Sequence, residues 1–367
     1  MRNDRRFVSS LYALLALVMS NCILPPPLPD PLPVERAIGI TTTVPVEVIL
    51  AAGLVPVDLN NVFVTAADPV ALVAEAERAG FPRTCCCWTK GIYGAARRYG
   101  IERIIGVTQG DCSNTHALME VLQFEGVECL PFEFPYQPDP LSLERAIREL
   151  AARLGTDPAR AEQWRSRLAG VRQKAAEIDH LTWRGGRVSG RENHLWLVST
   201  SDFCADPAAY ERQASQFLWQ AARRPAIAGG VRLGYVGVPP ITPELYDYTE
   251  SVGGVVVYNE MQRQFAMPDG GDSLAEQYSR YTYPYGIFAR LQDVRRECER
   301  RGLDGVIHYV QSFCFRRIED RILRQATRLP VLTVECDRPG PLSGQLKTRL
   351  EAFVQMLEAR KEGRPIF

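Results

Sequence analysis

The side chains in this sequence best suited to chemistry are cysteines, and three of them are adjacent. Cys85, Cys86 and Cys87 lie in the stretch FPRTCCCWTKGIYG. Adjacent cysteines rarely bridge each other, because the geometry of a disulfide is strained at that spacing. Their side chains also point in different directions. We therefore expect the triplet to supply one functional thiol that has two neighbouring thiols.

Two further cysteines each lie between an expected strand and an expected helix. Cys112 follows the strand-like residues 101–110, and Cys314 follows residues 303–310 in the same way. In open α/β sheets, ligands bind in the crevice beyond the carboxyl ends of the strands. A helix N-terminus also stabilises a thiolate through its free N–H groups and its dipole. We therefore expect these two thiols to face each other across a cleft between two halves of the chain.

Cys86, Cys112 and Cys314 are the thiols that we expect at this cleft, and together they would suit an iron–sulfur cluster. Three protein ligands instead of four would leave one iron open to a substrate or to water. The alternative interpretation is that free cysteines are small buried hydrophobic residues. We interpret Cys129, Cys204 and Cys298 as buried hydrophobic residues. For Cys336 both interpretations stay open.

Composition and charge define the class of protein. The 367 residues are 46% hydrophobic and 23% charged, which is typical of a folded protein with room for two domains. Lys and Arg together number 43, as do Asp and Glu together, so the chain has no net positive charge that would favour binding to nucleic acid. The ten cysteines lack the dense spacing of a secreted disulfide scaffold, and there is no CxxC pair to indicate a zinc finger. This cysteine usage favours a reducing, cytoplasmic location.

The N-terminal segment leaves other locations open. Residues 7–24 carry no charge, follow a net basic start and precede the proline-rich stretch PPPLPDPLP. Such a pattern is typical of a signal peptide or a short membrane anchor, and the alternative is a dispensable extension. Cys22 would suit a lipoprotein cleavage site, but Asn21 before it is larger than such sites normally accept. We exclude residues 1–33 from the fold prediction.

Two series of alternating strands and helices surround a helical segment. The expected strands are residues 37–45, 54–60, 101–110, 127–135, 194–200, 231–237, 253–260, 303–310 and 329–337. This alternation predicts parallel βαβ units with helices on both faces of each sheet. The predicted fold is therefore α/β, with two parallel-sheet halves joined by a helical segment. Its parts are an extension (1–33), a first half (34–140), a helical connector (141–189) and a second half (190–367).

Few side chains qualify as acid–base catalysts. His116 lies one helical turn after Cys112, where it could donate a proton or bond a cluster sulfur. The alternative is a surface histidine bonded to the backbone or to water. Glu47 opens an expected helix and would face the cleft, or else it favours the helix dipole. The tyrosines of residues 278–285 would line a substrate pocket or form an ordinary aromatic cluster.

Five stretches of the sequence, in order, resemble one protein family. They are similar to the D-component family of 2-hydroxyacyl-CoA dehydratases, which also contains benzoyl-CoA reductase subunits and double-cubane cluster proteins. The resemblance extends from about residue 37 to the C-terminus, and it implies two Rossmann-like halves with a cluster between them. The stretches are IGITTTVPVEVILAAGLVPVDLNN, TCCCWTKGIYG, GDCSNTHALMEVL, VIHYVQSFCFRRIEDRIL and VLTVECDRPGPLSGQLKTRLEAF.

The resemblance implies a ligand set. In the family the first ligand cysteine precedes a Lys or Arg by four positions, and here Lys90 selects Cys86. The second and third ligands match Cys112 and Cys314, and the three would hold a [4Fe–4S] cluster. Three adjacent cysteines exceed the family's motif, so Cys85 or Cys87 would be available to an [8Fe–9S] double cubane. A further departure is that residues 283–285 stand where some relatives carry another cysteine.

The resemblance also implies an activity and partners. The reaction would be a reductive, radical dehydration or reduction of an acyl-CoA, with electrons from an ATP-dependent iron–sulfur activator protein. The sequence has no P-loop and no GxGxxG fingerprint, so ATP hydrolysis would take place in the activator. One alternative is a double-cubane reductase of small molecules, and another is the cluster-carrying subunit of a heterodimer. We expect a homodimer or heterodimer, and the sequence does not name the acyl group.

Overall fold

The computed structural model describes residues 23–29, 32–227, 229–242 and 244–364. Its strands form two sheets of four parallel strands each, so the predicted α/β fold with two parallel-sheet halves is confirmed. The first sheet contains β1 (Ala37–Ile40), β2 (Val55–Asp58), β3 (Arg103–Gln109) and β4 (Glu128–Glu133). The second contains β5 (Val231–Gly237), β6 (Gly254–Asn259), β7 (Gly305–Val310) and β8 (Val331–Glu335).

The two sheets have the same topology. The strand orders are β2-β1-β3-β4 and β6-β5-β7-β8, so the first strand of each half pairs with both the second and the third. The order of winding therefore reverses between β1 and β3 in one half, and between β5 and β7 in the other. At such a point the connections leave the sheet on opposite faces, and a crevice opens beyond the carboxyl ends of the strands.

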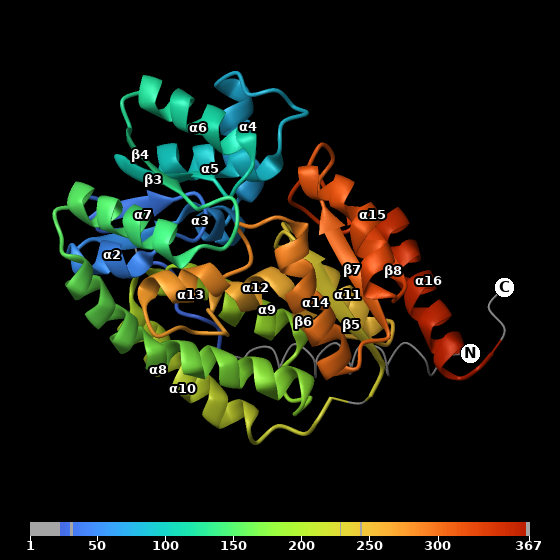
Figure 1. Ribbon diagram of the computed structural model, residues 1–367. Coiled ribbons are helices and arrows are strands. Elements are labelled where there is room, and N and C mark those ends of the chain that lie inside the picture. Colours follow the sequence, from blue (N-terminus) through green and yellow to red (C-terminus); the bar gives the residue numbers. More distant parts are fainter. Residues whose placement is uncertain (1–22, 30–31, 228, 243, 365–367) are drawn as a thin grey trace.

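Helices cover the sheets and join them (Figure 1). The first half contains α2 (Val46–Ala51), α3 (Leu59–Thr65), α4 (Pro69–Arg78), α5 (Cys87–Arg98) and α6 (Ser113–Phe124). Between the sheets in sequence lie α7 (Pro140–Arg153), α8 (Pro158–Trp183), α9 (Gly190–Val198) and α10 (Pro207–Ala221). The second half contains α11 (Glu244–Ser251), α12 (Glu260–Phe265), α13 (Leu274–Arg280), α14 (Ile287–Arg301), α15 (Phe315–Thr327) and α16 (Gly344–Lys361).

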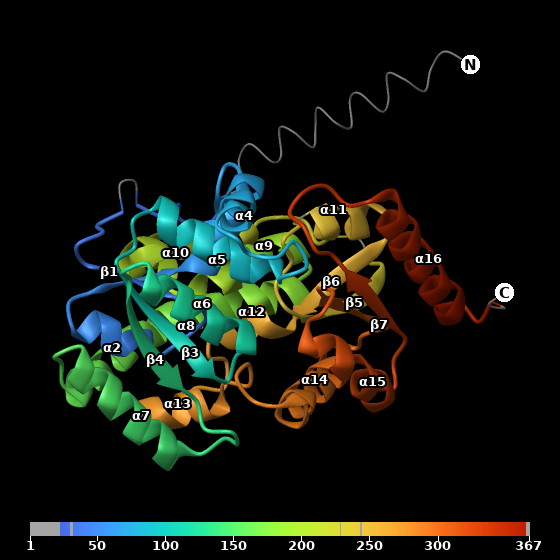
Figure 2. The ribbon, with the colours of Figure 1, turned by 90° about the horizontal axis from the view of Figure 1, so that it is seen from above.

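The helices between the sheets do not form a loose linker. In Figure 1, α8 and α10 run along the bottom of the molecule, beneath the first half and toward the second. Figure 2 shows α9 and α12 in the middle, between the two sheets. One hydrophobic core joins residues of α2 and α8 with residues of α12 and α13, which lie much later in the chain. The domain limits at residues 33, 140 and 189 stay predictions.

The strand predicted at residues 194–200 is wrong, because this segment is helical. It forms most of α9 and a following 3-10 turn, Ser199–Ser201. Ser189 starts the helix by accepting a hydrogen bond from the Glu192 N–H, and the Glu192 carboxylate accepts one from the Ser189 N–H. A short apolar run alone does not separate strand from helix, whereas this reciprocal cap favours a helix.

The N-terminal prediction falls mostly on residues 1–22, which lie outside the described residues, as does Cys22. Further along the predicted extension, Leu28 packs against a hydrophobic core that contains residues of both halves, and Leu32 is buried in this core. In the part of the chain that the structure describes, no helix has both the length and the apolar character needed to cross a membrane.

Candidate iron–sulfur cluster site

Three of the predicted cysteines occupy equivalent positions, each directly before the first turn of a helix. Cys86 is the N-cap of α5, Cys112 of α6 and Cys314 of α15. None of the three cysteine side chains forms a capping hydrogen bond with its own helix. Because the first N–H groups of a helix have no partner within it, each N-terminus favours negative charge on its own cysteine.

The turns before two of these cysteines have unusual backbone conformations. Gly110, between β3 and Cys112, has a φ of 104°, and a Cβ there would lie 2.7 Å from the Cβ of Pro284. Phe313, directly before Cys314, has a φ of 65° although it carries a side chain. Left-handed conformations let the chain turn sharply from strand to helix, and a non-glycine residue in one is strained. The two halves therefore present their cysteines through similar strand–turn–helix units.

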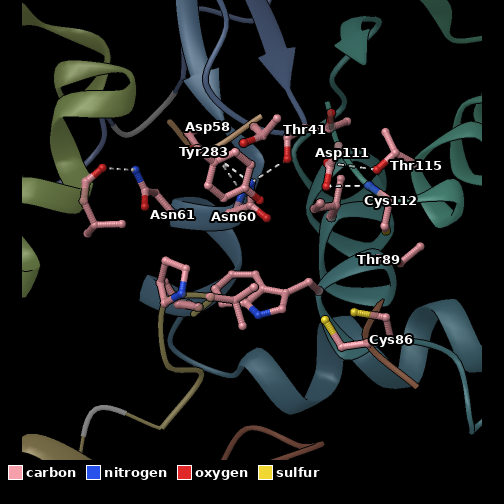
Figure 3. Close-up of a pocket in the computed structure, with 18 of the residues that line it drawn as sticks. Thr41, Asp58, Asn60, Asn61, Cys86, Thr89, Asp111, Cys112, Thr115 and Tyr283 are labelled. Atoms are coloured by element: carbon pink, nitrogen blue, oxygen red, sulfur yellow. Dashed lines mark hydrogen bonds between the residues drawn. The ribbon is translucent and has the colours of Figure 1, made fainter. Parts of the chain in front are cut away.

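The three cysteines lie between two hollows. A small cavity of about 100 Å³, called here the inner cavity, is lined by all three. An open depression of about 790 Å³, called here the outer groove, is lined by the same three. The polar walls of the inner cavity include Thr41, Asn60, Asn61, Asp111 and Arg316, and its apolar walls include Trp88, Ile92, Phe265, Tyr283 and Phe315. Figure 3 shows Cys86 and Cys112 on this cavity, with Thr89 beside them.

The members of the cysteine triplet have different surroundings. Cys86 lines both hollows, whereas Cys85 lines only the outer groove. Cys87 is 1% exposed and packs in a hydrophobic core that contains residues of both halves. The triplet is attached to the other half by Gln311, whose Oε1 accepts from the Cys87 N–H at 2.8 Å and from the Cys86 thiol at 3.1 Å.

Lys90, which selects Cys86 in the family motif, lines neither of the two hollows. Its ammonium group is 1% exposed and lies 2.8 Å from the Glu77 carboxylate. It also donates to the carbonyl oxygen of Arg83. The lysine therefore fixes the segment that leads into the triplet, which positions Cys86.

Burial favours the protonated form of two of these thiols, Cys86 and Cys112. It raises the pKa of Cys86. Burial and the neighbouring Asp111 carboxylate raise the pKa of Cys112 to about 12. A metal would therefore have to displace protons, as is usual for thiolate sites.

The donor set fits a cluster better than a single ion. No three His, Cys, Asp or Glu side chains of the described residues converge on one metal position. A single zinc ion needs ligands that meet at one point, whereas in a multi-iron cluster each cysteine binds a different iron. Cys86, Cys112 and Cys314 around a shared space match the second requirement. Cys336, directly after β8, lines neither hollow and lies 3.3 Å from the Thr242 hydroxyl.

The two predicted acid–base residues lie away from the cysteines. His116 is exposed, and its Nε2 lies 2.5 Å from the Thr108 carbonyl oxygen, so the ring turns back toward β3. Glu47 is completely buried and forms an ion pair with Arg172 at 2.7 Å. Its carboxylate also accepts from the Tyr278 hydroxyl at 2.9 Å. Neither residue lines the inner cavity, and their catalytic roles stay predictions.

His194, which sequence reasoning missed, is a neutral wall of the inner cavity. A chain of hydrogen bonds fixes its tautomer: Asn259 donates to the Gly190 carbonyl, Tyr246 to Asn259, and Gln262 to both Tyr246 and His194 Nδ1. The remaining nitrogen, Nε2, therefore carries the proton. Burial lowers the pKa of His194 to about 3. The ring is thus a hydrogen-bond donor that does not titrate near neutral pH.

Asp58 and Asp202 form a second feature that sequence reasoning missed. Asp58 ends β2, lines the inner cavity and is 3% exposed, and Asp202 is fully buried. The Asp202 carboxylate accepts from the Asp58 backbone N–H at 2.7 Å. Burial, and then the Asp58 charge, raise the pKa of Asp202 to about 7. The sequence could have indicated Asp58, because it lies at the carboxyl end of an expected strand. Ligands bind beyond the carboxyl ends of parallel strands, and this rule led to Cys112 and Cys314.

Replacing Asp58 by Asn is expected to weaken the pH dependence of stability. An aspartate in the unfolded chain has a pKa of about 3.8, whereas burial and the Asp58 charge raise the pKa of Asp202 to about 7 in the folded protein. Between these two pH values the folded state therefore binds more protons than the unfolded state. The free energy of unfolding then falls as pH rises, by up to about 1.4 kcal/mol per unit. Removing the Asp58 charge lowers the pKa of Asp202 in the folded protein, so stability depends on pH over a narrower pH range. Urea unfolding at about pH 5 and about pH 8 measures the slope, and equal slopes in both proteins would contradict the prediction.

The comparison with known protein families agrees with this geometry. Residues 41–357 match the family model described as 2-hydroxyglutaryl-CoA dehydratase, D-component. The match includes all three cysteines and the helices between the sheets. A comparison with curated proteins gave no match. Since the family model covers most of the chain, this protein belongs to the 2-hydroxyglutaryl-CoA dehydratase D-component family.

Proposed function

We propose that this protein is a 2-hydroxyacyl-CoA dehydratase-type enzyme that holds a [4Fe–4S] cluster through Cys86, Cys112 and Cys314. The observation that carries the proposal is the convergence of three helix N-cap cysteines, from both halves, between the inner cavity and the outer groove. When bound, such a cluster supplies a low-potential electron and an open coordination position for reductive dehydration or reduction of an acyl-CoA.

The residues around the cysteines would give this group a suitable setting. Three helix N-termini stabilise thiolates, and apolar side chains such as Trp88 and Phe265 limit water in the inner cavity. The side-chain amide of Asn60 donates to the backbone carbonyl oxygen of Thr41 at 2.8 Å (Figure 3), so Asn60 would form a fixed polar wall for a bound acyl group. Positioning and exclusion of water are the protein's contribution to cofactor chemistry.

The outer groove is the proposed docking side for an ATP-dependent iron–sulfur activator. Phe313 lies on it, directly before Cys314, with 82% of its surface exposed. An exposed aromatic side chain beside an electron-transfer site favours contact with a partner. A homodimer or heterodimer in the cytoplasm is part of the proposal and rests on the family and on the free cysteines.

A double-cubane reductase of small molecules is the second candidate. The observation in its favour is Cys85, which lines the outer groove next to Cys86 and is free to bind further iron. Cys87 does not support it, because this thiol is buried in the core.

Iron and acid-labile sulfide per chain, measured after anaerobic purification together with EPR of the reduced protein, test the proposal. About four irons per chain are expected, and Cys85→Ser should retain them. About eight irons, lost in Cys85→Ser, would favour the double cubane. Absence of iron after reconstitution would contradict both candidates. With four irons present, 2-hydroxyacyl-CoA esters and an activator would then be used to measure dehydration.

A further inference from the structure

Two acidic side chains, Asp58 and Asp111, line the inner cavity among the described residues. Asp111 belongs to the cysteine site, because its carboxylate accepts from the Cys112 N–H at 2.8 Å. Asp58 ends β2 and is 3% exposed, and Figure 3 shows it on the cavity wall with Asn60. The two hydrogen bonds that Asp58 accepts from Asn60 both use Oδ1, at 2.9 and 2.8 Å. Asp58 is therefore the acidic group that a bound acyl group would meet away from Cys112.

A second buried carboxyl group lies against Asp58. One oxygen of Asp202 accepts from the Asp58 N–H at 2.7 Å, and the other accepts from the Cys204 N–H at 2.9 Å. The Ser201 hydroxyl hydrogen-bonds the Asp58 carboxyl group and accepts from the Asn61 side chain at 3.0 Å. Within the part of the chain that is described, neither carboxyl group forms an ion pair with a Lys, Arg or His. Asp58 and Asp202 are called here the carboxyl pair.

The carboxyl pair holds a proton near neutral pH. Two adjacent buried carboxyl groups that lack a cation are unfavourable when both are charged. Burial raises the pKa of both groups, and that of Asp202 to about 7. The other titratable groups that face the pair are Tyr281, Cys204 and His194. Burial raises the pKa of Tyr281 and Cys204 and lowers that of His194, so these three are neutral near pH 7.

We infer that Asp58 is the acid–base catalyst of the proposed dehydration, and that Asp202 is a positioning residue that keeps a proton on the carboxyl pair. This inference rests on the proposed dehydratase function. Loss of water breaks the carbon–oxygen bond at the α-carbon and one carbon–hydrogen bond at the β-carbon, and a double bond forms between the two carbons. Asp58 gives its proton to the departing hydroxyl group, which leaves as water, and the Asp58 carboxylate then takes the proton from the β-carbon. The pair regains its proton and the overall change is redox-neutral, so an electron that starts the reaction is not consumed.

The test compares dehydration by the iron-loaded wild-type protein and by Asp58→Asn across a range of pH. Both proteins receive an activator and the 2-hydroxyacyl-CoA ester that the wild type converts fastest. Asparagine keeps the shape and the Oδ1 acceptor of Asp58, so the start of α3 should fold as before. We expect kcat to fall about a hundred- to ten-thousandfold, the usual contribution of a general acid–base group, without a comparable change in KM. Wild-type kcat should decrease as pH rises through about 7, where the pair loses its last proton.

Asp202→Asn separates proton transfer from a structural role. It removes a neighbouring negative charge, so the pKa of Asp58 falls and kcat should decrease at a lower pH than in the wild type. Infrared spectra of the same iron-loaded proteins, titrated without substrate, provide a measurement that does not depend on activity. In both Asp58→Asn and Asp202→Asn, the carboxylic-acid band of the remaining aspartate should disappear at a lower pH than that of the wild-type pair.

Asp206→Asn is the matched control. Asp206 is exposed and caps α10 by accepting from the Ala208 and Ala209 N–H groups, and asparagine is an equally good cap. This variant should match the wild type in kcat, in pH profile and in infrared titration.

Three other results would contradict the inference, and they are distinguishable. Wild-type kcat in Asp58→Asn would show that Asp58 does not transfer the proton. Reduced kcat in Asp58→Asn, with an unchanged pH profile in Asp202→Asn and unchanged infrared titrations, would assign both residues a structural role. An iron-loaded wild-type protein that dehydrates no 2-hydroxyacyl-CoA ester would contradict the proposed function itself, and the infrared titration would still show whether the pair shares a proton.

Discussion

Serine in place of Cys86, Cys112 or Cys314 is expected to lower the iron bound per chain to less than about a tenth of the wild-type value. Changes to groups that only support a metal ligand cost about 10- to 100-fold in affinity, and loss of the ligand itself costs at least as much. No other thiol lines both the inner cavity and the outer groove, so among the described residues none can replace the missing one. Iron analysis after anaerobic reconstitution provides the measurement.

The controls are cysteines that lie elsewhere. Cys129→Ser changes a half-buried thiol that contacts the Met119 carbonyl, and Cys204→Ser changes a buried thiol in the turn before α10. Both proteins should bind as much iron as the wild type. Equal iron in all five variants would show that the ligand assignment is wrong, and near-native circular dichroism of each variant would exclude misfolding as the cause.

Replacing Glu47 by Gln is expected to reduce the free energy of unfolding by about 3–5 kcal/mol, the usual effect of removing one partner of a buried ion pair. Arg172 would keep its charge while it is 7% exposed, and its Nε and Nη1 already have no hydrogen-bond partner among the described residues. Glu47 joins α2 to Arg172 of α8 and to Tyr278 of α13, so three distant segments would lose a common contact. Urea unfolding followed by circular dichroism measures the change.

An exposed ion pair serves as the control for Glu47. Glu144 and Arg148 pair at 2.7 Å on the surface of α7, and Glu144→Gln should cost less than about 1 kcal/mol. A catalytic role would give a different result, because Glu47→Gln would then lose activity while keeping wild-type stability. That outcome would favour the prediction that Glu47 is a catalytic residue.

The fold and the cysteine positions could be predicted from the sequence because both depend on local patterns. Strand, turn and helix follow one another around Cys112 and Cys314, and the carboxyl ends of parallel strands meet at one edge of a sheet. His116 shows the limit of such reasoning. It lies one turn after Cys112, but its ring bonds Thr108 of the preceding strand, a choice that sequence spacing does not determine.

The remaining site residues could not be predicted because they depend on contacts between distant segments. Asp58 lies against Asp202, which is 144 positions later. Arg316 lines the inner cavity with an Nη1 that has no hydrogen-bond partner among the described residues, and no pattern in the sequence shows this. His194 was missed for a local reason, since its segment was assigned to a strand.

The position of the cysteines between the two hollows has a consequence for the routes by which substrate and electrons would reach the site. A cluster held by the three cysteines that line both hollows would separate the outer groove from the inner cavity, so the substrate would have to enter the inner cavity from another side. A third hollow of about 450 Å³ shares Asn61, His194 and Val198 with the inner cavity, and residues 24–29 form part of its wall. Electrons and substrate would then use separate entrances, and reduction by the activator would not have to wait for product to leave.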